Sequence, residues 1–335
     1  MILSVLDQTP IAAGTTPAAA LANSIDLARA CEALGYHRYW LAEHHASPAL
    51  AGSAPEILIA AVAAATHTMR IGSGGVMLPH YSPLKVAEQF SALAGLFPGR
   101  IDLGLGRAPG SDQRTAIALQ RDRRQQAPHD FPQQLAELIG YLEDTLPDSH
   151  PFAPYARTLP GLPEAPEPWV LGSSGDSAEF AGSLGLPYCF ADFISPGGAA
   201  IAADYRARFT QRIPGSRPYT MVAVWTVTAQ TDAEAQRLAA PARMMMAHLL
   251  MGRPIAVPSP EVAVAWLADR PELAATARRR VVAGSPETVR AGLLEAAGEY
   301  AADEVMLVNI LHDHGDRKQS YVLAMQAMAG VAKAA

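Results

Sequence analysis

The sequence predicts a closed (β/α)₈ barrel. Short β-rich runs alternate with longer Ala- and Leu-rich amphipathic stretches, and repeated βα units are typical of a parallel sheet. Eight such units can be recognised in the 335 residues, which is the number that a closed barrel requires. A doubly wound open sheet would need a phosphate-binding glycine turn directly after its first strand, but the sequence there reads DQTPIAAG. We therefore expect an α/β fold with one barrel domain over residues 1–335.

Each strand is expected where a short apolar run lies between turn or helix signals. The expected strands are Ile2–Leu6, Tyr39–Ala42, Ile71–Leu78, Ile101–Leu105, Trp169–Gly172, Tyr188–Ala191, Tyr219–Thr228 and Glu304–Ile310. The first helix is expected over Pro17–Leu34, because Gly35 follows it at a position that favours left-handed backbone. Insertions are expected after the fourth strand, with helices near Asp112–Gln125 and Phe131–Thr145 and a Pro-rich loop to Pro168, and after the seventh strand, where Thr231–Val282 is interpreted as one helical region.

Composition and charge narrow the classes of function. The formal net charge is -6, and no block of Lys and Arg is present, so we expect no nucleic-acid or anionic membrane surface. The longest apolar runs, such as Ile57–Ala65, are too short to span a bilayer, and the N-terminal residues lack the pattern of a signal peptide. The two cysteines, Cys31 and Cys189, stand apart in apolar segments and do not suggest a disulfide framework. A cytoplasmic protein that acts on small molecules fits these features.

Polar and glycine residues gather at one end of the expected barrel. In such barrels the active site lies at the C-terminal ends of the strands. The segments there read EHH after the second strand, GSGGVMLPHYSP at the third, GRAPGSD after the fourth, GSSGDS after the fifth, DFISP after the sixth and LHDHGD after the eighth. Nothing similar gathers at the opposite end.

Two of these segments together suggest an anion site. Arg107 in GLGRAPG would supply a positive charge, and Ser173, Ser174 and Ser177 in LGSSGDS would supply hydroxyls at a helix N-terminus. Phosphate groups are often held by the later strands of a barrel. The alternative is that the serines cap a helix and that the arginine is a surface residue.

Two glycines stand at the end of the third strand. Gly74 and Gly75 in GSGGVMLP would let a flat ring lie against bare backbone, because glycine in a strand often marks the close approach of another group. The alternative is a β-bulge at a corner of the barrel.

The acidic and histidine residues allow several interpretations. His44 and His45 are adjacent at a strand end and should point to opposite sides, so they do not form a zinc site together, and we predict no metal site. One of them could face the barrel mouth and transfer protons near neutral pH, or both could be structural. Asp313 could line the mouth or cap the last helix. Four of the 11 methionines lie in Arg243–Arg253, which fits core packing or a pliable wall for an apolar substrate.

Together, the ordered motifs WLAEHH, GSGGVMLP, FPGRIDLGLGR, LGSSGDSAEFAGSLGLP and GSPETV resemble the bacterial luciferase-like flavin monooxygenases, from residue 1 to about residue 330. The most similar branch is that of the single-chain luciferase-like oxidoreductases. The resemblance implies that FMN binds at the strand C-termini after reduction by a separate, transiently bound reductase. With O₂ the reduced FMN would form a C4a-peroxyflavin, which oxygenates a small organic substrate. The resemblance also implies a homodimer.

The resemblance assigns roles residue by residue. His44 matches the histidine near the reactive edge of the flavin, with a role in proton transfer. Gly74 and Gly75 match the pair behind the isoalloxazine ring, which is often joined by a non-proline cis peptide. The positions that match the phosphate-binding residues are Arg107, Ser174 and Ser177. The candidates for contact with the substrate, or for support of these residues, are Glu43, His45, Asp192 and Asp313.

Three departures argue against light emission but not against flavin binding. The light-emitting enzymes have a cysteine where this chain has Gly106, a carboxylate where it has Ser173 and a tryptophan where it has Asp192. Related branches use a deazaflavin in place of FMN. A deazaflavin-dependent hydride-transfer oxidoreductase and a non-catalytic flavin-binding protein are therefore the alternatives to the monooxygenase.

Overall fold

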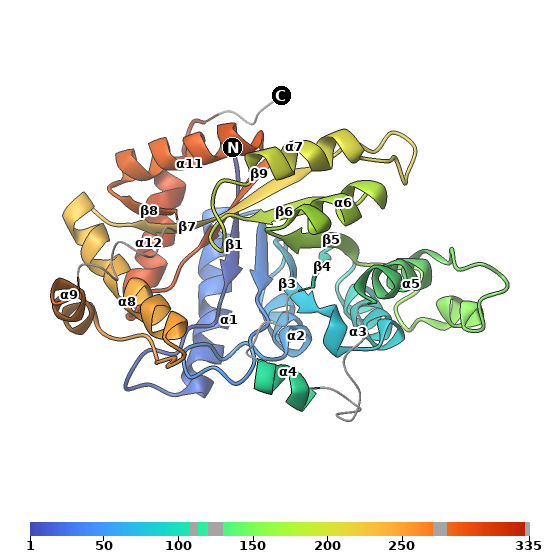
Figure 1. Cartoon of the computed structure of the whole chain (residues 1–335), viewed down its shortest axis with the longest axis horizontal. Helices are drawn as coiled ribbons and strands as arrows, with labels where there is room; N and C mark the ends of the chain where they lie inside the picture. Colours follow the sequence, from blue (N-terminus) through green and yellow to red (C-terminus); the bar gives the residue numbers. More distant parts are fainter. Residues whose placement is uncertain (108–112, 120–129, 271–279, 332–335) are drawn as a thin grey trace.

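The fold is a closed barrel of parallel strands surrounded by helices (Figure 1). The computed structural model describes residues 1–107, 113–119, 130–270 and 280–331. The barrel strands are β1 (Ile2–Asp7), β2 (Arg38–Leu41), β3 (Arg70–Met77), β4 (Ile101–Gly106), β5 (Glu167–Gly172), β6 (Tyr188–Ala191), β7 (Thr220–Thr228) and β9 (Glu304–Val308). Strands β1 to β7 pair in chain order, and the pairs β7–β9 and β9–β1 close the ring. The predicted (β/α)₈ barrel is confirmed.

The helices pack around the barrel (Figure 1). They are α1 (Pro17–Leu34), α2 (Pro55–Ala65), α3 (Pro83–Leu96), α4 (Gln113–Leu119), α5 (Phe131–Glu143), α6 (Gly175–Ser183), α7 (Ala199–Arg208), α8 (Asp232–Leu250), α9 (Pro260–Ala268), α11 (Pro286–Tyr300) and α12 (His314–Ala327). Several begin at a hydroxyl that accepts a hydrogen bond from a backbone N–H three residues later, as Thr16, Thr231 and Ser285 do. These caps fix where each helix starts after its strand.

The insertions after β4 and β7 are present, but two details differ from the sequence prediction. The region Thr231–Val282 is not helical throughout, because Val281–Gly284 forms a short strand, β8, that pairs with the outer half of β7. Its four residues form a paired strand only because β7 extends beyond the ring. The Pro-rich loop contains a 3-10 helix, Ala153–Thr158. Of the expected helix Asp112–Gln125, only Gln113–Leu119 lies within the described residues, and it is helical.

The barrel interior is filled at its amino-terminal end. Arg38 lies across the start of the barrel, with its guanidinium 2.9 Å from Asp102 and 3.1 Å from Glu304. The Arg38 guanidinium also lies 4.6 Å from the centre of the Trp169 ring. Arg70 makes a second ion pair with Asp102. The amino-terminal end is therefore sealed by buried, mutually compensated charges, and the space for a ligand lies at the other end.

Within the described residues, no helix has the length and apolar character needed to cross a membrane.

Candidate active site

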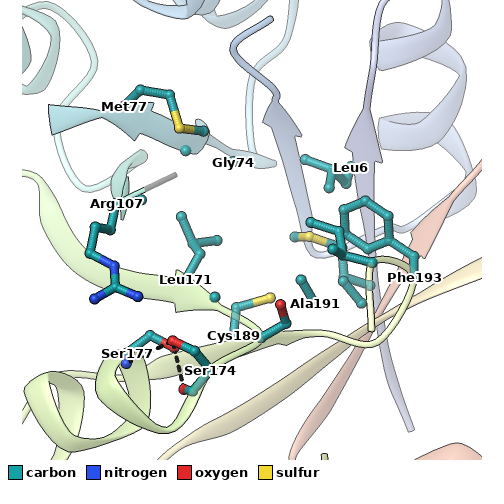
Figure 2. Close-up of a pocket in the computed structure, with 17 residues that line it drawn as sticks. Leu6, Gly74, Met77, Arg107, Leu171, Ser174, Ser177, Cys189, Ala191 and Phe193 are labelled. Atoms are coloured by element: carbon teal, nitrogen blue, oxygen red, sulfur yellow. Dashed lines mark hydrogen bonds between the residues drawn. The ribbon is translucent and has the colours of Figure 1, made fainter. Parts of the chain in front are cut away.

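A cavity of about 440 Å³ lies at the carboxyl ends of the strands (Figure 2). This first cavity is lined by residues of seven barrel strands and the loops that follow them. They include Leu6, Gly74, Gly75, Met77, Arg107, Leu171, Ser173, Ser174, Ser177, Cys189, Ala191, Phe193, Ile194, Ala223 and Met306. All six residues predicted from the sequence as cofactor ligands line this one cavity.

The glycine pair gives the first cavity a bare backbone face. The peptide bond between Gly74 and Gly75 is cis, and the β3–β4 register shifts between Gly74 and Val76, so a bulge is present as well. A Cβ atom added to Gly75 would lie 2.7 Å from the Gly104 carbonyl oxygen, so a side chain does not fit there. The backbone faces the cavity beside the apolar side chains of Leu6 and Leu171. This surface fits a flat, largely apolar ring.

One side of the first cavity carries groups suited to an anion. Figure 2 shows Arg107 extending toward the turn that contains Ser174 and Ser177. Ser174 caps helix α6 and accepts a hydrogen bond from the Ser177 backbone N–H at 3.4 Å. The Arg107 guanidinium lies 2.6 Å from Asp176, and both side chains are about half exposed. A guanidinium beside a helix N-terminus fits a phosphate group.

The hydroxyl of Ser177 is less available than that of Ser174. Ser177 is buried, and its Oγ donates to the Ser174 carbonyl oxygen at 2.7 Å. The same Oγ lies 2.9 Å from the Tyr188 hydroxyl. Burial raises the pKa of Tyr188, so its phenol stays protonated. Ser177 thus supports the turn that holds Ser174.

His44 and His45 line a second cavity of about 500 Å³, which shares Phe193 and Ile194 with the first. The Nε2 of His44 lies 2.7 Å from the Gln8 Oε1, and the Nε2 of His45 lies 2.7 Å from the Glu43 Oε1. Both histidines line one cavity, although the sequence predicted that they would point to opposite sides. Each histidine therefore has a hydrogen-bond partner of its own. Within the described residues, no three or more His, Cys, Asp or Glu are grouped so that they could hold a metal ion.

Glu43 connects the ends of β2 and β3. Its carboxylate is fully buried and accepts hydrogen bonds from the Met77 backbone N–H at 2.9 Å and the Tyr81 hydroxyl at 2.8 Å, besides contacting His45. Burial and the Glu43 carboxylate both raise the pKa of Tyr81, so Tyr81 remains a hydrogen-bond donor. Glu43 therefore holds the segment after Gly75 and orients His45.

Asp192 and Asp313 lie outside both cavities. Asp192 accepts a hydrogen bond from the Tyr300 hydroxyl at 2.6 Å, and burial raises the pKa of its carboxyl. Its neighbours Ala191 and Phe193 face the first cavity instead. Asp313 caps α12 by accepting from the Asp316 backbone N–H at 2.8 Å, which was the alternative interpretation of its motif.

Several lining residues were not predicted. Gln8 follows β1 at the carboxyl end, so the barrel argument that singled out the other segments applies to it as well. Phe193 lies in the DFISP segment, which the sequence placed at the carboxyl end of the barrel. No feature of the sequence predicts that Phe193 lies between two cavities. Met245 and Met246 line the second cavity and also belong to a buried apolar cluster, so both interpretations of the methionine-rich segment fit.

Comparison with known proteins identifies the family. The model of the luciferase-like monooxygenase family matches residues 1–303. The chain belongs to this family. It is 40% identical over 325 residues to a luciferase-like monooxygenase of Escherichia coli K12, covering 96% of this chain and 95% of the relative. It is 37% identical over 329 residues to the N-acetyl-S-alkylcysteine monooxygenase of Bacillus subtilis, covering 97% and 98%. The enzyme is thus an oxidoreductase of the monooxygenase class, as the resemblance implied.

Solved structures share the fold. The apo structure of MsnO8 has a TM-score of 0.89 at 42% identity, covering 98% of each chain. The oxygenating constituent of 3,6-diketocamphane monooxygenase from Pseudomonas putida, in complex with FMN, has a TM-score of 0.71 at 18% identity, covering 99% and 98%. An F420-dependent secondary alcohol dehydrogenase has a TM-score of 0.62 at 13% identity, covering 97% and 98%. The barrel is therefore common to proteins that use different flavin-type cofactors.

Proposed function

We propose that this luciferase-like monooxygenase is FMN-dependent and belongs to a two-component system. It would take reduced FMN from a separate reductase that binds only transiently, and act in the cytoplasm as a homodimer. The observation that carries the proposal is the pairing, in one cavity, of a bare glycine face with an anion site at Arg107 and Ser174. A planar ring system that carries a phosphate group needs a flat surface for the ring and an anion site for the phosphate. When bound, reduced flavin supplies the electrons for the activation of O₂.

The residues of the first cavity divide between ring and phosphate. Gly74 and Gly75, with Leu6 and Leu171, would hold the ring. Arg107, Ser173, Ser174 and the N–H groups at the start of α6 would hold the phosphate. Asp176 is 60% exposed, so Arg107 can exchange this carboxylate for a phosphate with little loss. Figure 2 shows Phe193 on the side of the cavity opposite Arg107, so the ring end would face the shared wall with the second cavity.

His44 is proposed to hold and move a proton at this end of the site. An amide oxygen only accepts hydrogen bonds, so the contact with Gln8 places a proton on the His44 Nε2 and fixes the ring. We expect His44→Ala to lower oxygenation by about 10²–10⁴-fold, the usual range for a lost proton-transfer group, while the Kd for FMN stays unchanged. Steady-state kinetics on an identified substrate measures this, with the exposed His67→Ala as the control. Unchanged turnover of the His44 variant would show that His44 does not transfer a proton in the reaction.

The cofactor is tested by titrating the protein anaerobically with reduced FMN and with reduced F420, then adding ¹⁸O₂ and candidate substrates. The proposal requires binding of reduced FMN and one labelled oxygen in the product. The F420-dependent neighbours on the same barrel make deazaflavin the second candidate, which predicts F420 binding and oxidation or reduction of the substrate without label. FMN binding with no product from any substrate would indicate a non-catalytic flavin-binding protein. Light scattering of the purified chain tests the homodimer.

A further inference from the structure

The second cavity has two unlike sides. Its apolar side is formed by helix α8, strand β7 and neighbouring loops, through Leu50, Trp225, Met245, Met246, Leu249 and Ile310. Its polar side is formed by the segments that directly follow β1 and β2. The polar side chains there are Gln8, His44, His45 and Ser47. A ligand that fills this space would meet hydrogen-bonding groups at one end and apolar side chains along the rest.

No Lys, Arg, Asp or Glu is among the described residues that line the second cavity. The Glu43 carboxylate, which contacts the lining residue His45, already accepts hydrogen bonds from the Met77 N–H and the Tyr81 hydroxyl. A charged ligand would lose hydration here without a fixed countercharge, so it would bind more weakly than an uncharged ligand of the same shape. The first cavity differs in this respect, because Arg107 lines it.

The apolar side can hold ligands of different shapes. Met245 and Met246 are buried, and methionine side chains adapt to irregular partners because they are unbranched and flexible. Burial of apolar surface against these side chains would supply most of the binding free energy. The polar side would then fix the orientation of the ligand.

From this arrangement we infer that the second cavity is the substrate site and takes an uncharged, mainly apolar organic molecule with one polar group turned toward Gln8 and His44. Its use as a substrate site rests on the proposed function, since Phe193 and Ile194 separate it from the cavity assigned to the flavin. The chemical class of its ligand rests on the lining residues alone.

The class is tested with pairs of probes that share one skeleton and differ in charge and in one methyl group. We would titrate the flavin-free protein with methyl hexanoate and hexanoate, and with methyl phenylacetate and phenylacetate, following the change in tryptophan fluorescence and the heat of binding. Trp225 lines the cavity and reports on it directly. We expect each ester to bind at least about tenfold more tightly than its acid. Tighter binding of the acids, or no binding of either ester, would overturn the inference.

The location is tested by two neighbouring substitutions on α8. Leu249 lines the second cavity and is 51% exposed, while Leu250 does not line it and is 68% exposed. Leu249→Arg puts a guanidinium at the rim, and we expect it to shift the acid-to-ester preference toward the acids by about tenfold or more. Leu250→Arg should leave both affinities unchanged. Equal behaviour of the two variants would place the ligand elsewhere and overturn the inference.

The outcome for FMN separates this inference from the proposed function. Esters that bind to a protein without affinity for FMN would leave the ligand class standing and remove the proposed function. FMN binding without ester binding would leave the proposed function standing and overturn the ligand class.

Discussion

The two ends of the barrel use arginine in opposite ways. At the amino-terminal end, the Arg38 side chain is 6% exposed and pairs with Asp102 and Glu304, both of which are fully buried. At the carboxyl end, Arg107 is 49% exposed and its partner Asp176 is 60% exposed. Removing Arg38 leaves buried carboxylates without their countercharge. Removing Arg107 leaves only an exposed carboxylate, which water can solvate. The partners of a charge, and not its residue type, thus distinguish the structural role of Arg38 from the binding role proposed for Arg107.

The largest effect is expected from Arg38→Met. The variant leaves Asp102 and Glu304 buried with less compensation, and we expect a loss of about 3–5 kcal/mol in the free energy of unfolding. Urea denaturation measures this loss. Arg217→Met is the control, because Arg217 is 74% exposed and pairs with Asp303 at the surface, where a pair contributes about 0–1 kcal/mol. A loss for Arg38→Met no greater than the control would show that the buried carboxylates do not depend on Arg38 for stability.

Arg107→Met should weaken FMN binding and leave the free energy of unfolding nearly unchanged. Loss of a charge-assisted hydrogen bond, about 1.5–3 kcal/mol, corresponds to roughly 10–100-fold weaker FMN binding. The unfolding free energy should change little, because the lost ion pair is exposed. Fluorescence titration with FMN, together with urea denaturation, measures both quantities. Arg157→Met, which breaks another exposed pair, with Asp144, serves as the control. Unaltered FMN affinity of the Arg107 variant would contradict a phosphate site at this end.

The fold could be predicted from sequence because each barrel strand is a short apolar run between turn signals. Strand β8 could not, because Val281–Gly284 has no period of its own and exists only through its pairing with the outer part of β7. The glycine pair and Arg107 could be placed at one end, since parallel strands align their carboxyl ends. The separation of His44 from the first cavity could not be predicted, because it depends on where Phe193 lies between the two cavities. Asp192 follows β6 at the end of the barrel that carries the cavities, as predicted. Its side chain lies outside both cavities and accepts a hydrogen bond from the Tyr300 hydroxyl.

The smallest effect is expected at Ser174, where one side chain serves both stability and binding. As the cap of α6 it accepts from the Ser177 N–H at 3.4 Å, and Ser285 caps α11 with the same distance to the Thr288 N–H. Replacing either serine by alanine should cost about 1 kcal/mol of stability. Only Ser174→Ala should also weaken FMN binding, and by a few-fold, because the N–H groups of α6 and Arg107 remain. Equal FMN affinity of both variants would mean that Ser174 acts at this end only as a cap, and that the phosphate depends on Arg107 and the helix backbone.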